Sequence, residues 1–311
     1  MPQDQVENIL GKKIAVTGSS GLIGGRLSVF LKNRGDVILP LVRRLPRPDS
    51  LELQWSPDTG VVDAPGLDNL DAVVHLAGEN IAQGRWTETV KERLVQSRVS
   101  ATRLLAENIA RCTVPPRVLV SASAIGYYGD RGEEEIDEKS HPGEGFLSEL
   151  TQQWEKACQP AMDAGVRVVM LRIGVVLAKD GGALMKMVPV FKLGVGGPIG
   201  SGRQWMSWIT IDDVVSAIGH CVDHPKLVGP VNLTSPNPAR NKEFAHALGK
   251  CLGRPAKIPV PAAMIRILFG EMGQETVLSG AKVVPRRLQE TGFHFRYPTL
   301  NDALAHQLGC N

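Results

Sequence analysis

The sequence predicts an α/β fold: a doubly wound parallel sheet of the Rossmann type with a smaller C-terminal α+β substrate lobe. Short β-rich runs alternate with longer helical patterns through the first half of the chain, and a glycine-rich loop joins the first strand to the first helix. After about Gly174 this rhythm stops, and Gly- and Pro-rich loops separate short helices. We therefore expect a dinucleotide-binding domain over 1–174 and a substrate lobe over 175–311, with some segments of the lobe returning to the sheet.

The expected strands are continuous apolar runs, as in sheets that helices cover on both faces. The helices show apolar residues at helical spacing. In chain order we expect a strand over 13–17, a helix over 22–33, strands over 37–42 and 72–76, a long helix over 89–110, a strand over 117–121, a helix over 146–163, a strand over 167–171, and helices over 212–222 and 241–251.

Composition excludes several classes of function. The net charge of +3 is small and the basic residues are dispersed, so no nucleic-acid partner is expected. No apolar run reaches the roughly 18 residues of a membrane span, so no membrane partner is expected. The first residues lack the pattern of a targeting segment, which favours a soluble cytoplasmic protein; an organellar form that has lost such a segment is the alternative. A small-molecule substrate and a possible homodimer complete the expected partners.

No metal site is expected, because the chain has no C-x-x-C or H-E-x-x-H motif. The cysteines are odd in number and widely spaced, so we expect reduced thiols in a reducing compartment. They are Cys112, Cys158, Cys221, Cys251 and Cys310.

The loop Thr17–Gly24 carries the clearest functional signal. Gly18 allows a tight turn, Gly21 allows a pyrophosphate to approach the backbone, and Gly24 lets the helix pack on the strand. The N-terminus of the following helix offers unpaired N–H groups to the phosphates. A plain structural turn is the alternative, but a strand before and a helix after the loop favour a dinucleotide site.

The residues after the second strand indicate the type of cofactor. An NAD-binding domain places a carboxylate there for the ribose hydroxyls. This chain has Arg43 and Arg44 instead, and guanidinium groups suit the 2′-phosphate of NADP. We therefore expect NADP rather than NAD, with two solvated surface arginines as the alternative.

Three motifs together, Thr17-Gly-x-x-Gly-x-x-Gly24, His75–Gly78 and Ser121–Ser123, resemble the extended short-chain dehydrogenase/reductases of the epimerase-like branch. A narrower resemblance covers nearly the whole chain. It includes Arg85-Trp86-Thr87, Ser123–Gly129, Trp154-Glu155, Gly196–Gly202, Gln204-Trp205-x-Ser207-Trp208-Ile209 and the tail around Gly292–Pro298. These motifs are similar to those of atypical epimerase-family proteins with a C-terminal domain of unknown function, some of them labelled SulA-like cell-division inhibitors.

The resemblance implies roles for particular residues near the cofactor. It places Arg43 at the adenosine phosphate, Arg98 close to the cofactor, and Ser121 near the nicotinamide ribose. It also implies that Gly174 to Val176 close over the nicotinamide. The loop residues implied at the pyrophosphate are Thr17, Gly18, Ser20, Gly21, Leu22, Ile23 and Gly24, and those lining the passage across the sheet are Leu76, Ala77 and Gly78.

The Tyr-x-x-x-Lys pair of the superfamily is missing. The helix expected to carry it begins Phe146-Leu147-Ser148-Glu149-Leu150-Thr151, with neither residue present. Three hypotheses remain open. In the first, Ser123 with Tyr127 or Tyr128 performs the chemistry; the alternative for the tyrosines is packing beneath the cofactor. In the second, hydride transfer uses a proton from Glu149, Lys156 or the substrate. In the third, the protein binds NADP(H) as a sensor or structural ligand without turnover.

The glycine-rich segment 194–202 and the residues after it lie where the extended members hold substrate. We expect Gly197, Arg203, Gln204, Trp205 and Trp208 to contact it, with backbone N–H groups and Arg203 suited to an anion and the tryptophans to a flat ring. A structured loop with tryptophans in the interdomain core is the alternative. The sequence thus favours an NADP(H)-binding, epimerase-like oxidoreductase acting on a small polar substrate such as a sugar nucleotide, against a silent NADP(H)-binding regulatory protein.

Overall fold

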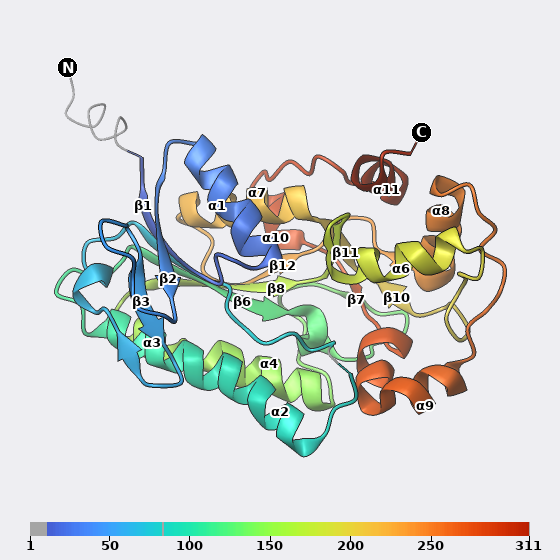
Figure 1. Cartoon of the computed structure of the whole chain (residues 1–311), viewed down its shortest axis with the longest axis horizontal. Helices are drawn as coiled ribbons and strands as arrows, with labels where there is room; N and C mark the ends of the chain where they lie inside the picture. Colours follow the sequence, from blue (N-terminus) through green and yellow to red (C-terminus); the bar gives the residue numbers. More distant parts are fainter. Residues whose placement is uncertain (1–10, 83, 311) are drawn as a thin grey trace.

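A computed structural model describes residues 11–82 and 84–310, so the N-terminal residues used to predict the absence of a targeting segment lie outside the described residues. Its main sheet has eight strands in the order β12-β8-β6-β5-β1-β2-β3-β4 (Figure 1). The elements are β1 Lys13–Thr17, α1 Leu22–Asn33, β2 Val37–Val42, β3 Leu53–Ser56, β4 Val61–Val62, β5 Ala72–His75, α2 Glu88–Val95, α3 Ala101–Ala110, β6 Val118–Ala124, β7 Glu135–Ile136, α4 Phe146–Lys156, α5 Gln159–Asp163, β8 Arg167–Ile173, β9 Val175–Ala178, α6 Gly182–Lys192, β10 Trp205–Met206, β11 Trp208–Thr210, α7 Ile211–Asp223, β12 Gly229–Leu233, β13 Ala239–Arg240, α8 Asn241–Cys251, α9 Ala262–Gly273, β14 Lys282–Val283, α10 Arg286–Glu290 and α11 Leu300–Leu308.

Helices cover both faces of the sheet, which confirms the predicted Rossmann architecture. Neighbouring strands are parallel except β4, which runs antiparallel to β3. α1 and α7 pack on one face, and α3, α4 and α5 lie across the other (Figure 1). Alternate residues of β1 show the consequence: Ile14 and Val16 face α1, whereas Ala15 faces α3.

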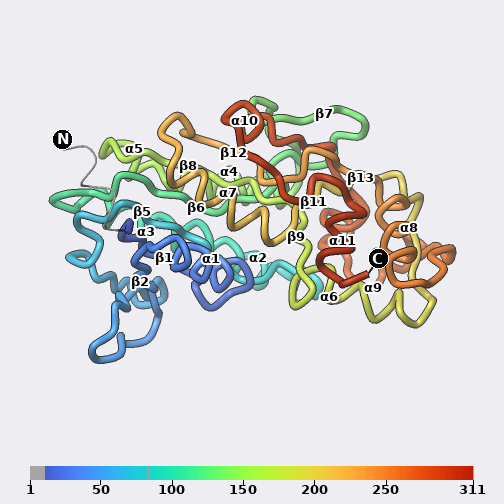
Figure 2. The backbone as a smooth tube through the Cα atoms, turned by 90° about the horizontal axis from the view of Figure 1, so that it is seen from above, coloured from blue at the N-terminus to red at the C-terminus, as the bar shows by residue number. Residues whose placement is uncertain are grey.

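Residues from beyond Gly174 also contribute to this sheet and its helices. β12 adds the edge strand beside β8, and α7 packs against α1. The rest forms a lobe with its own core, in which Trp208 and Phe244 are buried with residues of α6, α8 and α11. Figure 2 shows this lobe at one end of the elongated molecule.

Two of the predicted helices are interrupted in the structure. The long helix over 89–110 is divided by a π-helical segment, η3 (Gln96–Ser100), between α2 and α3. The helix over 146–163 is two helices, because Pro160 sits in the first turn of α5 and cannot donate its backbone to a continuous helix.

One cysteine pair corrects the expectation of five reduced thiols. Cys251, the last residue of α8, forms a disulfide with Cys310, which follows α11. Packing of α8 on α11 brings together two residues 59 apart in sequence, and their spacing gave no signal of it. Cys112, Cys158 and Cys221 are free. Within the described residues, no helix is long and apolar enough to cross a membrane.

Candidate functional site

The glycine loop forms an open cradle between β1 and α1. Gly18 has φ +66°, and a Cβ there would lie 3.0 Å from the backbone nitrogen of Ala77. A Cβ at Gly24 would lie 2.1 Å from the carbonyl oxygen of Gly18, so only glycine lets the helix pack this closely on the loop. Gly21 is the exposed N-cap of α1, and neither a capping side chain nor an acidic residue occupies the first turn. The first-turn N–H groups are therefore available to an anion, and the cradle fits a pyrophosphate.

Thr17 lies beneath this cradle and joins β1 to β5. It is fully buried, and its hydroxyl accepts from the backbone N–H of Leu76 (3.0 Å) and Ala77 (3.2 Å). The same hydroxyl lies 2.7 Å from Nδ1 of His75, whose Nε2 lies 3.0 Å from the Thr102 hydroxyl. Burial lowers the pKa of His75 to about 4, so the ring is neutral. Thr17 thus shapes the loop from below and is withdrawn from direct contact with a cofactor.

The two arginines after β2 have different environments. Arg44 forms an ion pair with Glu52 (2.6 Å), which also accepts from the backbone N–H of Arg47 (3.0 Å). The hydrogen bond from Arg44 lowers the pKa of Glu52 to about 2. Arg43 is exposed, and no side-chain hydrogen bond or ion pair engages it among residues 11–82 and 84–310. Arg43 is thus the arginine available to a 2′-phosphate.

A buried cation, Arg98, lies behind the segment that follows β5. Arg98 is only 8% exposed; it donates to the carbonyl of Glu79 (2.7 Å) and lies over the Trp154 ring. A Cβ at Gly78 would lie 3.6 Å from its guanidinium carbon. Burial lowers the pKa of Arg98 to about 10, which leaves it charged at neutral pH. Leu76, Ala77 and Gly78 therefore pass between the cradle and a fixed positive charge.

Two of the predicted catalytic residues belong to an internal polar network. Ser123 donates to Glu155 (2.8 Å), and Glu155 binds Arg172 through both carboxylate oxygens (2.8 Å each). Arg172 donates to the hydroxyl of Tyr128 (2.9 Å), which donates to Asn232 (2.7 Å). Tyr128 is fully buried, and burial raises its pKa to about 12. Tyr128 therefore has a packing role inside the fold, which was the alternative to catalysis, and we withdraw it from the catalytic candidates.

Tyr127 is placed differently. It is half-buried, and the guanidinium of Arg172 lies 3.4 Å from its ring centroid. Its hydroxyl has no hydrogen-bond partner in the described part of the chain. Among Ser123, Tyr127 and Tyr128, Tyr127 therefore has the only hydroxyl free of an internal partner.

The start of α4 shows which residues lie near the end of β6. Phe146 turns away from β6 and packs on Trp86, with ring centroids 5.1 Å apart. Leu147 is the residue that faces the end of β6: a Cβ at Gly126 would lie 3.1 Å from its own Cβ. One turn later, the Thr151 hydroxyl donates to the carbonyl of Leu147 (2.7 Å).

A carboxylate from the C-terminal lobe caps this helix. Glu275 accepts from the backbone N–H of Phe146 (3.0 Å) and Leu147 (2.8 Å) with its two oxygens. Sequence reasoning missed Glu275, because nothing local marks a cap that lies 128 residues away.

The segment from Gly174 to Gly182 runs alongside the cradle. Gly174 lies against Ser207, since a Cβ there would lie 2.4 Å from the Ser207 carbonyl oxygen, and Val176 pairs with Ile209. Farther along, Asp180 forms an ion pair with Arg26 of α1 (2.6 Å). Ser121 is buried in the middle of β6 and pairs with His75, the last residue of β5. These placements keep Ser121, Gly174 and Val176 at the carboxyl edge of the sheet, where the cradle lies.

The predicted substrate residues are only partly exposed to a ligand. Trp208 is fully buried in the core of the lobe, in line with the alternative that the tryptophans fill a core. We therefore withdraw it from the substrate site. Gly197 serves close packing, because a Cβ there would lie 2.0 Å from the carbonyl oxygen of Ile258. Gln204 donates to two backbone carbonyls, whereas Arg203 is exposed. Trp205 is half-buried, and Arg240 lies 4.3 Å from its ring centroid.

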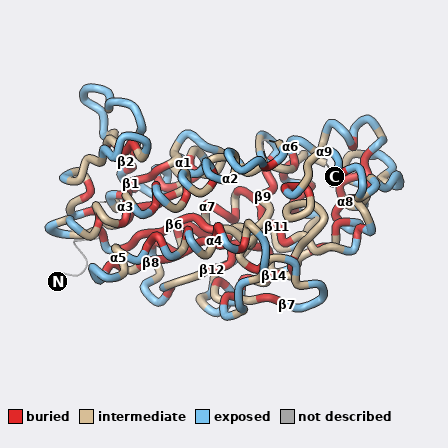
Figure 3. The backbone as a smooth tube through the Cα atoms, turned by 90° about the horizontal axis from the view of Figure 1, so that it is seen from below, coloured by how far each residue is buried: buried red, intermediate tan, exposed pale blue. Residues whose placement is uncertain are grey.

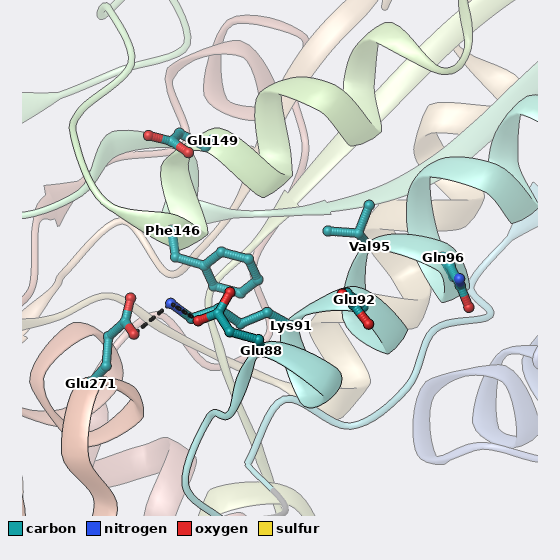
Figure 4. A pocket seen from close by; sticks show the side chains of 8 residues that line it. All are labelled: Glu88, Lys91, Glu92, Val95, Gln96, Phe146, Glu149 and Glu271. Atoms are coloured by element: carbon teal, nitrogen blue, oxygen red, sulfur yellow. Dashed lines mark ion pairs between the residues drawn. The ribbon is translucent and has the colours of Figure 1, made fainter.

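A cavity of about 590 Å³ lies away from the cradle, between α2, α4 and α9 (Figure 4). Its lining includes Lys91, which forms an ion pair with Glu271 (2.6 Å) and whose pKa that hydrogen bond raises. The described residues contain no group of three metal ligands. His220 and His224 are four residues apart, but His224 follows the end of α7 in an extended conformation, and no third ligand joins them among the described residues.

With this geometry in place, comparison with known proteins defines the class. The model of the NAD-dependent epimerase/dehydratase family matches residues 14–233, and that of a domain of unknown function matches 260–307. The chain therefore belongs to the NAD-dependent epimerase/dehydratase family, as the sequence predicted.

Particular relatives extend over nearly the full length. An epimerase family protein of Mycobacterium tuberculosis is 43% identical over 293 residues, covering 94% of this chain and 96% of that protein. The Arabidopsis thaliana homologue of epimerase family protein SDR39U1, named as chloroplastic, is 40% identical over 299 residues, covering 94% and 85%. The crystal structure of human SDR39U1 with NADPH has a TM-score of 0.87 and 36% identity, covering 96% of this chain and 99% of that one.

Proposed function

We propose that this chain binds NADP(H) at the β1–α1 cradle and transfers hydride between the nicotinamide and a small polar substrate. The observation that carries the proposal is the open first turn of α1 together with Arg43, which no side chain pairs with among residues 11–82 and 84–310. The presence of NADPH in the crystal structure of the human relative supports the same cofactor here.

The roles of the cofactor residues follow from their positions. The backbone of Gly18, Ser20 and Gly21 and the first-turn N–H groups of Leu22, Ile23 and Gly24 hold the pyrophosphate. Arg43 binds the 2′-phosphate as a charge-assisted pair. Leu76 to Gly78 line the path across the sheet with Arg98 behind them, and Ser121, Gly174 and Val176 surround the nicotinamide end.

Tyr127 is the residue we assign to the proton. When bound, the nicotinamide accepts or supplies the hydride. Reduction of a carbonyl needs a proton at the substrate oxygen, and the Tyr127 hydroxyl is free to donate it. Because the Ser123 hydroxyl donates its hydrogen bond to Glu155, its oxygen is left to accept a hydrogen bond from a substrate hydroxyl. Arg203, Gln204 and Trp205 provide the lobe side of a site for a polar substrate such as a sugar nucleotide.

A second function, NADP(H) binding without turnover as a regulatory or interaction protein, is favoured by a different observation. α4 presents Leu147 and Thr151, rather than tyrosine and lysine, to the end of β6. Ser123 and Tyr128 are also engaged inside the fold.

Turnover measurements on two tyrosine variants distinguish these functions. NADPH oxidation is followed with a panel of carbonyl compounds, including keto-sugar nucleotides. Tyr127→Phe should lower turnover by about 10²- to 10⁴-fold with unchanged NADPH affinity, because it removes only the proton donor. Tyr128→Phe is the matched control: it should retain turnover and lose stability. If folded wild-type protein oxidises NADPH with no compound, while NADPH alters binding of a partner protein, the second function replaces the first.

A further inference from the structure

Exposed apolar side chains are concentrated in two segments of the C-terminal lobe, 181–200 and 250–270. Eight of the fifteen large hydrophobic side chains exposed in the described part of the chain belong to them. These are Met185, Val190, Leu193, Val195, Ile258, Met264, Ile267 and Leu268.

Helix α9 shows the pattern most clearly. Ile265 turns into the protein and is buried, whereas Met264, Ile267 and Leu268 are exposed. The exposed three are spaced three and four residues apart and so share one outward face. A helix that is apolar on its outward face as well as its inward face is typical of one that has a further partner.

The two segments lie next to each other. The loop after α6 and the loop before α9 are joined by hydrogen bonds from Val260 to Pro198 and from Gly200 to Val260, both 2.8 Å. Figures 2 and 3 show α6 and α9 at the same end of the molecule, and Figure 1 shows α9 below α6, so the bonded loops are the link between the two helices. We call the exposed surface of 181–200 and 250–270 the apolar–basic face.

Within residues 181–200 and 250–270 every charged side chain is basic; the next residue of α9, Glu271, is acidic and forms an ion pair with Lys91 (2.6 Å). Neither segment contains aspartate or glutamate. Six basic residues, all exposed, accompany the apolar ones: Lys186, Lys192, Lys250, Arg254, Lys257 and Arg266. Apolar side chains among cations are typical of surfaces that enter the interface of an anionic bilayer.

We propose that the apolar–basic face docks on a membrane surface rich in anionic lipid, with α9 lying along the interface. This mode of binding needs no spanning helix, and it replaces the expectation of no membrane partner, which rested on the absence of a span.

Two observations favour a bilayer over a second copy of the chain. A two-fold dimer brings the same patch from both subunits together, so cations would face cations with no carboxylate between them. The apolar side chains also protrude: Leu193 is 79% exposed and Ile267 72%. Protruding apolar side chains insert into an acyl boundary without the matching hollow that a protein partner must supply.

Sedimentation of the full chain with vesicles tests the proposal. Vesicles of phosphatidylcholine alone are compared with vesicles containing about one-third phosphatidylserine. The wild-type chain should bind the second kind, and added salt should weaken that binding. The double variant Ile267→Ser with Leu268→Ser should bind at least about tenfold more weakly, since it removes the inserted side chains. Lys257→Glu with Arg254→Glu should do the same, because each basic residue contributes roughly fivefold.

Leu45→Ser is the matched control, because Leu45 is 76% exposed but lies outside the face, so its binding should equal wild type. Cofactor affinity of every variant verifies its fold. Failure of the wild-type chain to bind phosphatidylserine vesicles overturns the proposal, as does binding by both double variants that equals that of the wild-type chain. Self-association in light scattering that Ile267→Ser with Leu268→Ser abolishes, without vesicle binding, would assign the face to a second copy instead.

Discussion

At the scale of single residues, two adjacent arginines have different environments. In sequence Arg43 and Arg44 are equivalent candidates for the 2′-phosphate. The structure distinguishes them because Glu52, at the start of the next strand, binds Arg44 at 2.6 Å and leaves Arg43 unpaired among the described residues. An arginine already engaged by a carboxylate must give up that partner to bind a phosphate.

This difference predicts the effect of two matched variants. Arg43→Ala should weaken NADPH binding by about 1–3 kcal/mol, the value of a hydrogen bond between charged groups, and should barely alter NADH binding. Arg44→Ala should change NADPH binding much less. Calorimetric titration of both variants with both cofactors measures this. Equal losses for NADPH and NADH in Arg43→Ala would show that Arg43 does not meet the 2′-phosphate.

At the scale of elements, α4 depends on a residue of the other lobe. Gly145 precedes the helix with φ +95° and offers no side-chain cap. The carboxylate of Glu275 supplies the cap from η5 (Gln274–Leu278) and accepts from two orphan N–H groups. A negative charge at this end also suits the helix dipole. The lobe therefore fixes the helix that borders the end of β6.

Glu275→Ala should lower the free energy of unfolding by about 1–3 kcal/mol, because it leaves two N–H groups of α4 without an acceptor. Thr87→Ala removes the local cap of α2, where the Thr87 hydroxyl accepts from Val90, and should cost only about 0.5–2 kcal/mol. Urea unfolding of the two variants compares them. A cost for Glu275→Ala no greater than that of an exposed substitution such as Glu290→Ala would refute the capping role.

At the scale of the whole molecule, the sequence predicted the features that depend on local patterns. It did not predict the contacts between residues that are far apart in the chain. Alternating strands and helices predicted the Rossmann sheet, since each pattern is local. The glycines of the cradle were predictable because β1, loop and α1 are contiguous. The position of Trp208 in the lobe core was not, because an apolar ring suits a core and a ligand wall equally.

Long-range contacts explain the remaining differences. In sequence Tyr128 is a catalytic candidate, but in the structure its hydroxyl is hydrogen-bonded to Arg172 and Asn232, which belong to two other strands. The disulfide between Cys251 and Cys310 depends on the packing of two helices that no spacing rule connects. Such partners are chosen by the folded topology, so a single sequence does not identify them.

Both proposed functions require NADP(H) to bind at the cradle, and calorimetric titration measures that binding. Gly21 has φ −78° and ψ 174°, which other residues adopt, and a Cβ there would lie 3.2 Å from the carbonyl oxygen of Gly18, so Gly21→Val fills the cradle at the cost of a small shift of the loop. Calorimetry of folded, cofactor-free protein should find tight NADPH binding, weak NADH binding, and neither in Gly21→Val. Absence of NADPH binding to the wild-type chain, or unchanged affinity in Gly21→Val, would contradict the account.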